Sequence, residues 1–206
     1  MIIHRDIGQR SDEWHQLRIG RCTGTRFKEL MTGKPPTVET LARKIAAEKI
    51  TGKSADQPFK ISGAMEQGVE REAEARACFE TDNLVKVDEV GFIEKDDLFG
   101  VSPDGITDDN RGFEVKCPLP GTHIGYLMDI QSLYKAYKWQ VLSALWVSGF
   151  DSWFLCSYCP EFDVERRLLV YNVALSDKDR GLIDEKTEAL RARVGEILEA
   201  VGNVSK

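Results

Sequence analysis

GVSPDGITDDNRGFEVKCP, residues 100–118, combines a turn-rich loop with a segment in which apolar and charged side chains alternate. Because side chains of a strand point alternately to opposite faces, Glu114 and Lys116 share one face and their apolar neighbours pack on the other. The short polar loop before this segment lets the strand fold back beside the residues that follow Asp104. We therefore expect two carboxylates and one ammonium group to converge on one spot.

The predicted cluster of Asp104, Glu114 and Lys116 has the composition of a metal-dependent hydrolytic site. Two carboxylates held close together raise each other's pKa unless a cation lies between them. Carboxylate oxygens suit Mg²⁺, and also Mn²⁺; such an ion lowers the pKa of a bound water and offsets charge on a phosphate. Lys116 can orient that water or stabilise the oxyanion. An exposed strand pair would also explain Glu114 and Lys116, but a Pro-Asp pair ten residues upstream favours the site.

The rest of the chain predicts a mixed α/β protein. Apolar residues recur at helical spacing in some segments and alternate between turn residues in others. Helices are expected over 11–31 (with a turn at 20–24), 38–51, 64–80, 133–147 and 177–200. Strands are expected over 85–93, 98–101, 105–107, 113–117, 153–159 and 167–173. This order predicts an α/β fold with a central mixed β-sheet flanked by helices, in one domain over residues 1–206.

Composition excludes some classes of protein. The formal net charge of −6 argues against a polycation that coats DNA by bulk charge, but not against local DNA contacts. Five scattered cysteines suit reduced thiols, and we interpret the apolar run around Cys156 and Cys159 as a packed strand rather than a metal site. No signal peptide and no membrane-spanning apolar run is visible, so we expect a soluble, intracellular protein without membrane contact.

The central motif and the segments around it resemble a known family. Pro103-Asp104 followed by Glu114-Val115-Lys116 is the signature of the PD-(D/E)xK nuclease superfamily, which implies a restriction-endonuclease-like core. The chain further resembles the phage lambda-type alkaline exonucleases, the YqaJ-like viral recombinase family, over about residues 9–160. The matching segments are SDEWHQLRIG (11–20) with TGT (23–25), GVEREAEAR (68–76), SPDG (102–105), EVKCP (114–118) and YKWQV (137–141).

The resemblance assigns roles to the cluster and its surroundings. Asp104 and Glu114 match the metal ligands of the family, assisted by the Val115 carbonyl, and Lys116 matches the residue that positions or activates the water. Glu72 falls on the helical acid of the family, which implies a further metal ligand and catalytic residue.

Helical residues near the site have alternative interpretations. Glu70 is one alternative to Glu72, and Glu74 is a weaker one, because a solvated acidic face explains some of these carboxylates. Gln140 matches the catalytic glutamine that the family places near the nucleophile. Tyr137 lies one turn before it, where it can contact DNA. Without the resemblance, both would read as ordinary helix residues.

The resemblance also implies contacts with DNA ends. Arg18 and Thr25 match the positions that hold a terminal 5′-phosphate. A guanidinium can bind phosphate through two bonds, and a hydroxyl at a helix start lies beside free backbone N–H groups. A surface arginine and a plain N-cap are the alternative interpretation. Met65 falls where the family places an apolar wedge that separates the strands, although core packing is an equally good explanation.

The function implied by the resemblance is a Mg²⁺-dependent exonuclease. Such an enzyme digests one strand of linear double-stranded DNA from its 5′ end, releases 5′-mononucleotides and leaves a 3′ overhang for recombination by strand annealing. A homotrimeric ring, a single-strand annealing protein as partner, and a phage or prophage gene expressed in the bacterial cytoplasm are also implied. The alternatives are an endonuclease or repair nuclease with the same core, and a non-catalytic DNA-end-binding protein.

Overall fold

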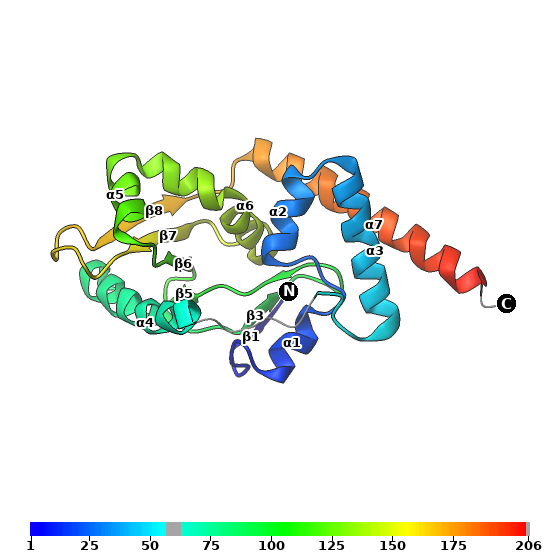
Figure 1. Ribbon diagram of the computed structural model, residues 1–206, viewed down its shortest axis with the longest axis horizontal. Coiled ribbons are helices and arrows are strands. Elements are labelled where there is room, and N and C mark those ends of the chain that lie inside the picture. Colours follow the sequence, from blue (N-terminus) through cyan, green and yellow to red (C-terminus); the bar gives the residue numbers. More distant parts are fainter. Residues whose placement is uncertain (57–62, 205–206) are drawn as a thin grey trace.

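The computed structural model describes residues 1–56 and 63–204, with side chains described outside residues 63–70 and 204 (Figure 1). The helices are α1 (Asp12–Arg18), α2 (Gly24–Thr32), α3 (Pro35–Thr51), α4 (Gly63–Asn83), α5 (Pro120–Met128), α6 (Ile130–Ser148) and α7 (Asp177–Val204). The strands are β1 (Ile2–His4), β2 (Val87–Asp88), β3 (Phe92–Glu94), β4 (Gly100–Val101), β5 (Gly105–Thr107), β6 (Gly112–Lys116), β7 (Trp153–Tyr158) and β8 (Leu168–Val173).

Five strands form the central sheet, in the order β2-β5-β6-β7-β8. Strands β6 and β7 run parallel while the other neighbours run antiparallel, so the sheet is mixed, as the sequence predicts. Helix α4 covers one face, where Phe79 packs against Phe113 and Phe154. Helix α6 covers the other face (Figure 1), and its Gln140 reaches Glu114 of β6. The predicted alternation along β6 is therefore confirmed: the apolar side chains face α4 and the acid faces α6.

A smaller sheet and two long helices complete the molecule. Strands β1, β3 and β4 form a three-stranded sheet beside α1. Helix α7 packs along α3, where Arg193 Nε donates to Glu39 Oε2 at 2.7 Å, and it then extends beyond the rest of the molecule (Figure 1). Within the described residues, no helix combines the length and the apolar character needed to cross a membrane.

The prediction of one strand over residues 85–93 is wrong. Strand β2 pairs with β5 in the central sheet, whereas β3 pairs with β1 and β4 in the smaller one. The chain changes sheets at Gly91, where an added Cβ would lie 2.0 Å from the carbonyl oxygen of Ile7. One apolar run thus contains a crossing between two sheets, which the periodicity of a single segment does not reveal.

The sequence pattern does not predict strand β1 or helix α5. Strand β1 has three residues, too few to establish an alternation. Helix α5 begins at Pro120 and contains Gly121 and Gly125, residue types that are typical of loops. A proline nevertheless suits the first helical position, because the N–H that it lacks has no partner there.

The strand interpretation of the CxxC segment is confirmed. Strand β7 is buried along its whole length between β6 and β8. Cys156 lies within this strand and Cys159 follows it, and both are fully buried free thiols. Their packing accounts for the apolar run that contains them.

Candidate active site

The turn before β5 places Asp104 beside β6. The register pairs Gly105 with Phe113, and two residues further along it Pro103 would lie opposite Val115. Proline has no N–H to donate, so the ladder of hydrogen bonds stops there. The Asp104 carboxylate replaces a main-chain acceptor at this point, since its Oδ2 accepts a hydrogen bond from Val115 N at 2.8 Å. The N–H and C=O of one strand residue point to the same side, so the Val115 carbonyl also faces Asp104.

The Glu114 carboxylate lies at the centre of the site, and only 3% of this residue is exposed. Its Oε1 accepts a hydrogen bond from Lys116 Nζ in a close ion pair, and another from Gln140 Nε2 at 2.5 Å. Lys116 Nζ also lies 5.2 Å from the centre of the Tyr137 ring. The structure therefore brings Gln140 and Tyr137 of α6 to the same face of β6 as the acid and the lysine.

Burial raises the pKa of both acids of the motif. Burial, and then the charge of Asp104, raise the pKa of Glu114 to about 8. Burial also raises the pKa of Asp104, although the charge of Lys116 and the bond from Val115 N oppose part of that rise. Burial alone would lower the pKa of Lys116, but the charges of Glu114 and Asp104 hold it above its ordinary value. The site thus favours positive charge between its carboxylates.

Glu72 of α4 faces Asp104 across a cleft. Both residues line a cavity of about 350 Å³ between α4 and the N-terminal segment. Burial, and then the charge of Asp104, raise the pKa of Glu72. Glu74, by contrast, is exposed, and its Oε2 accepts a hydrogen bond from the Tyr158 hydroxyl at 3.5 Å. The side chain of Glu70 lies outside the described residues, so Glu72 is the described candidate that faces the site.

The oxygen atoms that could hold a metal ion belong mainly to Asp104 and Glu114. In the described part of the chain, no three Asp, Glu, His or Cys side chains already form a metal-binding group. Glu72 therefore lies near the pair without completing a preformed set. The Val115 carbonyl is the main-chain oxygen that faces the same place.

Arg18 lies at the end of α1 and reaches the residue before the Pro-Asp pair. Its guanidinium lies 4.2 Å from the centre of the Trp14 ring, and its Nη1 donates to Ser102 Oγ at 3.1 Å. Trp14 Nε1 donates to the same hydroxyl at 2.9 Å. Burial, and then the charge of Arg26, lower the pKa of Arg18 to about 10, so an anion is favoured there. The sequence did not indicate that Ser102 contacts Arg18, because 84 positions separate the two residues.

Thr25 lies in the first turn of α2 with its side chain exposed. The predicted helix start is confirmed, but the alternative interpretation of Thr25 as the N-cap is wrong. Thr23 is the N-cap, and its side chain makes no capping hydrogen bond. Met65 lies in α4, and its side chain is outside the described residues, so its predicted role as a wedge stays a prediction.

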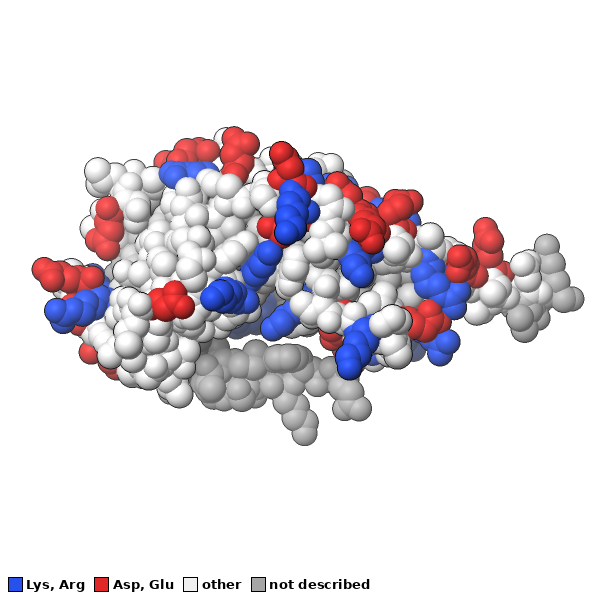
Figure 2. Space-filling view, turned by 90° about the horizontal axis from the view of Figure 1, so that it is seen from above, with Lys and Arg blue, Asp and Glu red and all other residues white. Residues whose placement is uncertain are grey.

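Basic side chains are concentrated locally despite the net negative charge. Figure 2 shows Lys and Arg side chains along the middle of the face seen from above, with many Asp and Glu side chains nearer its edges. Several Lys and Arg side chains form ion pairs with carboxylates of the same chain. Lys138 Nζ lies 2.8 Å from Asp179, and Arg71 Nη2 lies 2.7 Å from Glu161. A ligand with phosphate groups would compete with these ion pairs for the same cations.

The sequence itself places the chain in a family. Residues 13–151 match the YqaJ-like viral recombinase domain. The chain belongs to this family. The matched range of the YqaJ-like domain runs from before Arg18 to beyond Gln140, so it includes both the acid cluster and the arginine that contacts Ser102. No curated protein matches this chain.

Solved structures share the fold of this YqaJ-like domain. The alkaline exonuclease LHK-Exo from Laribacter hongkongensis is 24% identical, with a TM-score of 0.80 over 95% of this chain and 98% of that one. LHK-Exo in complex with dAMP is 25% identical, with a TM-score of 0.79 over the same shares. A phage related exonuclease from Haemophilus somnus is 14% identical, with a TM-score of 0.65 over 95% and 96%. The predicted nuclease fold is thus confirmed, and the family indicates a DNA exonuclease.

Proposed function

We propose that this chain is a Mg²⁺-dependent 5′-to-3′ exonuclease of double-stranded DNA. It digests one strand of a linear duplex, releases 5′-mononucleotides and leaves a 3′ overhang for recombination by strand annealing. The observation that carries the proposal is the cluster of Asp104, Glu114 and Lys116, in which Glu114 is buried and the other two residues are half-buried. Two carboxylates with raised pKa values beside an ammonium group suit metal-dependent hydrolysis of a phosphodiester. The dAMP bound to the similar LHK-Exo supports mononucleotides as products.

Asp104 and Glu114 are the metal ligands in this proposal. Mg²⁺ keeps several waters and takes one or two carboxylates, so this pair fits it, with the Val115 carbonyl and Glu72 close by; Mn²⁺ also prefers oxygen ligands and can substitute. When bound, the ion lowers the pKa of a water and offsets charge on the phosphate. The raised pKa of Glu114 supports the assignment, because a carboxylate that resists ionisation alone ionises readily beside a cation.

Lys116 and Gln140 position the reacting groups. The Lys116 ammonium is held between Glu114 and the face of the Tyr137 ring, which fixes it beside both carboxylates. From there it orients the attacking water and stabilises negative charge on a phosphate oxygen. Gln140 donates its amide N–H to Glu114, so its own carbonyl oxygen remains to accept a hydrogen bond from the water.

Arg18, Ser102 and Thr25 form the pocket for the terminal 5′-phosphate, called the end pocket below. The Arg18 guanidinium is stacked on Trp14 and bonded to Ser102, so it is already oriented before a ligand arrives. Ser102 lies two residues before Asp104, which brings a phosphate bound here close to the metal ligands. Thr25, in the first turn of α2, adds a hydroxyl beside the N–H groups of a helix start.

The resemblance to lambda-type exonucleases supports two further parts of the proposal. The chain assembles into a homotrimeric ring around double-stranded DNA ends, and a single-strand annealing protein takes up the overhang. A mass near three protomers in light scattering tests the ring, and a mass near one protomer counts against it.

Polarity is tested with a duplex that carries one 5′-phosphate and a fluorescent label at the 3′ end of the same strand. The proposal predicts labelled fragments that shorten step by step in Mg²⁺, a complementary strand that is degraded more slowly from its 5′-hydroxyl end, and unlabelled 5′-mononucleotides in solution. Early release of the label as a mononucleotide would establish the opposite polarity and overturn this part of the proposal.

A further inference from the structure

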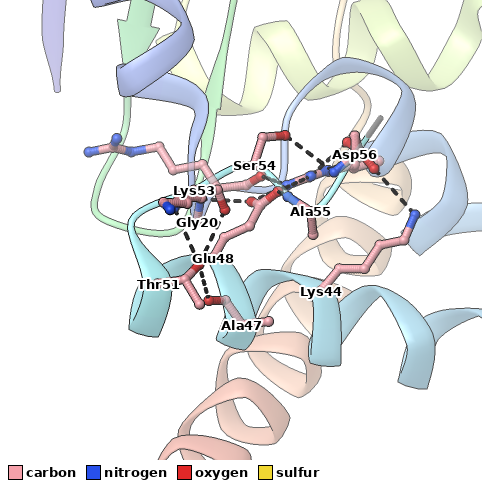
Figure 3. A network of polar contacts seen from close by, with 11 residues as sticks. Gly20, Lys44, Ala47, Glu48, Thr51, Lys53, Ser54, Ala55 and Asp56 are labelled. Carbon is pink, nitrogen blue, oxygen red and sulfur yellow. Dashed lines mark hydrogen bonds and ion pairs between the residues drawn. The ribbon is translucent and has the colours of Figure 1, made fainter. Parts of the chain in front are cut away.

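The carboxylate of Glu48 in α3 accepts hydrogen bonds from segments on either side of α3, among them Gly20 and Ala55 (Figure 3). Glu48 is 1% exposed. Its Oε2 accepts hydrogen bonds from Gly20 N at 2.8 Å and from Arg26 Nη1 at 2.7 Å. Its Oε1 accepts from Ala55 N at 2.8 Å and from Arg26 Nη2 at 2.5 Å. The second partner of Arg26 is Asp56, whose Oδ2 lies 2.7 Å from Nη2.

These bonds hold both ends of the turn between α1 and α2. Gly20 is the second residue after Arg18, and Arg26 directly follows Thr25. Arg26 Nη1 also donates to the carbonyl oxygen of Arg21 within the turn, at 3.1 Å. Gly20 has a φ of +72°, and a Cβ added to it would lie 2.9 Å from Lys49 Cγ. The turn therefore lies directly against α3, and one carboxylate is bonded to residues at both of its ends.

The arrangement is better suited to fixing geometry than to adding stability. Removing two charges from water costs about as much as their attraction returns, so a buried ion pair contributes little net stability. A carboxylate that accepts two parallel N–H bonds from one guanidinium, however, fixes the direction of both groups. Burial opposes ionisation of Glu48, but the bonds from Arg26, Ala55 and Gly20 more than offset it and lower its pKa. Glu48 is thus a charged, fully bonded anchor.

We infer that Glu48 is a positioning residue for recognition of the terminal 5′-phosphate. It sets the separation and direction of Arg18 and Thr25, which lie on two different helices and reach the same phosphate only if the turn between them keeps its shape. Glu48 itself is buried behind the turn and does not touch the DNA. This inference rests on the proposed function, because it assigns Glu48 to the end pocket of that function.

The test is the preference for 5′-phosphorylated over 5′-hydroxyl ends, measured as the ratio of kcat/KM on the two linear duplexes. Glu48→Gln keeps the shape of the side chain but turns an amide N–H₂ toward donors, so the turn loses part of its anchor. We expect the preference to fall about tenfold, through KM on phosphorylated ends, with kcat at saturation kept. Glu39→Gln is the matched control, because it removes an ion pair of the same helix with Arg193 of α7, away from the turn.

A double variant separates positioning from a general loss of structure. Arg18→Ala with Glu48→Gln should show no lower preference than Arg18→Ala alone, since both changes act through one pocket. A folded Glu48→Gln enzyme with the wild-type preference would overturn the inference, and so would an equal loss on both kinds of end. Should Glu48→Gln not fold, Asp56→Asn decides instead: this carboxylate is half exposed and bonds the same Arg26, so a smaller drop in preference is expected and no drop contradicts the inference.

The failure of the inference is distinguishable from the failure of the proposed function. If the wild-type chain does not degrade linear duplex, the proposed function is wrong. If the wild-type chain degrades 5′-phosphorylated and 5′-hydroxyl ends equally, the end pocket and the inference about Glu48 are both contradicted. The proposed hydrolytic site is not affected by that result. If Arg18→Ala abolishes the preference for phosphorylated ends but Glu48→Gln leaves it intact, only the inference about Glu48 is contradicted.

Discussion

The proposed hydrolytic site and the proposed end pocket share one stretch of chain, since Ser102 lies two residues before Asp104, yet they are built in different ways. The site is made from one strand and the turn before its neighbour, and a hydrogen bond from Val115 N to the Asp104 carboxylate joins the two. The end pocket is assembled from two helix ends and a loop, with Arg18 and Ser102 joined across 84 positions of sequence. Burial differs as well, because Glu114 is 3% exposed whereas Thr25 lies on the surface.

This difference separates two tasks. In the proposed function, the site around Glu114 controls the charge that develops during hydrolysis, and its contribution is the same for every DNA end. The end pocket is proposed to control which end is held there, through an arginine that is oriented by Trp14 and Ser102. Substitutions in the site should therefore change the rate on all substrates, and substitutions in the pocket should change the preference between substrates.

The largest expected effect is that of Lys116→Ala. Removing the ammonium group takes away the charge that orients the water and stabilises the phosphate oxygen. We therefore expect kcat to fall about a hundredfold to a thousandfold on either kind of end. Arg43→Ala is a control that also removes one cation, since Arg43 is exposed on α3 and pairs with Glu39 of the same helix. Rates are measured on linear duplex in Mg²⁺. A Lys116→Ala enzyme that keeps wild-type activity would remove the lysine from the mechanism.

A smaller and more selective effect is expected from Arg18→Ala. Loss of a charge-assisted contact with the terminal phosphate should lower kcat/KM on 5′-phosphorylated ends about tenfold to a hundredfold and leave 5′-hydroxyl ends nearly unchanged. Competition between the two duplexes in one reaction measures this directly. An equal loss of kcat/KM on both kinds of end would mean that Arg18 acts on the site as a whole. The proposed division of tasks between site and pocket would then be wrong.

The same contrast explains how much could be predicted from the sequence. The alternation from Gly112 to Lys116 and the Pro-Asp pair before β5 are local, so the position of Asp104 beside Glu114 followed from the pattern. Ser102 could not be recognised as a partner of Arg18, because no local pattern reports a contact between distant segments. The crossing at Gly91 was missed for a similar reason: it depends on the close approach of Ile7, which lies in another segment.

The smallest expected effect concerns stability and pH. Without metal, the folded chain keeps a proton on Glu114 up to about pH 8, whereas the unfolded chain loses it at the ordinary pKa of 4.5. The folded state therefore binds more protons in this range, and its stability falls as the pH rises from 4.5 to about 8. Since a cation replaces that proton, Mg²⁺ should raise Tm more at about pH 9 than at about pH 6, by a few degrees.

Melting curves with Mg²⁺ and with a chelator measure this difference. Arg18→Ala serves as the control, because a change in the end pocket should leave the pH dependence of the Mg²⁺ effect as it is in the wild type. An equal gain in Tm at both pH values would argue against Glu114 as a metal ligand.

The most direct test of an end-dependent hydrolytic site compares two forms of one DNA. Wild type and Lys116→Ala are incubated in Mg²⁺ with a closed circular duplex and with the same duplex made linear. The account predicts that wild type degrades the linear form and leaves the circle intact, and that the variant degrades neither. Nicking of the circle by the wild type would show an endonuclease, and degradation of the linear form by Lys116→Ala would show that hydrolysis takes place elsewhere.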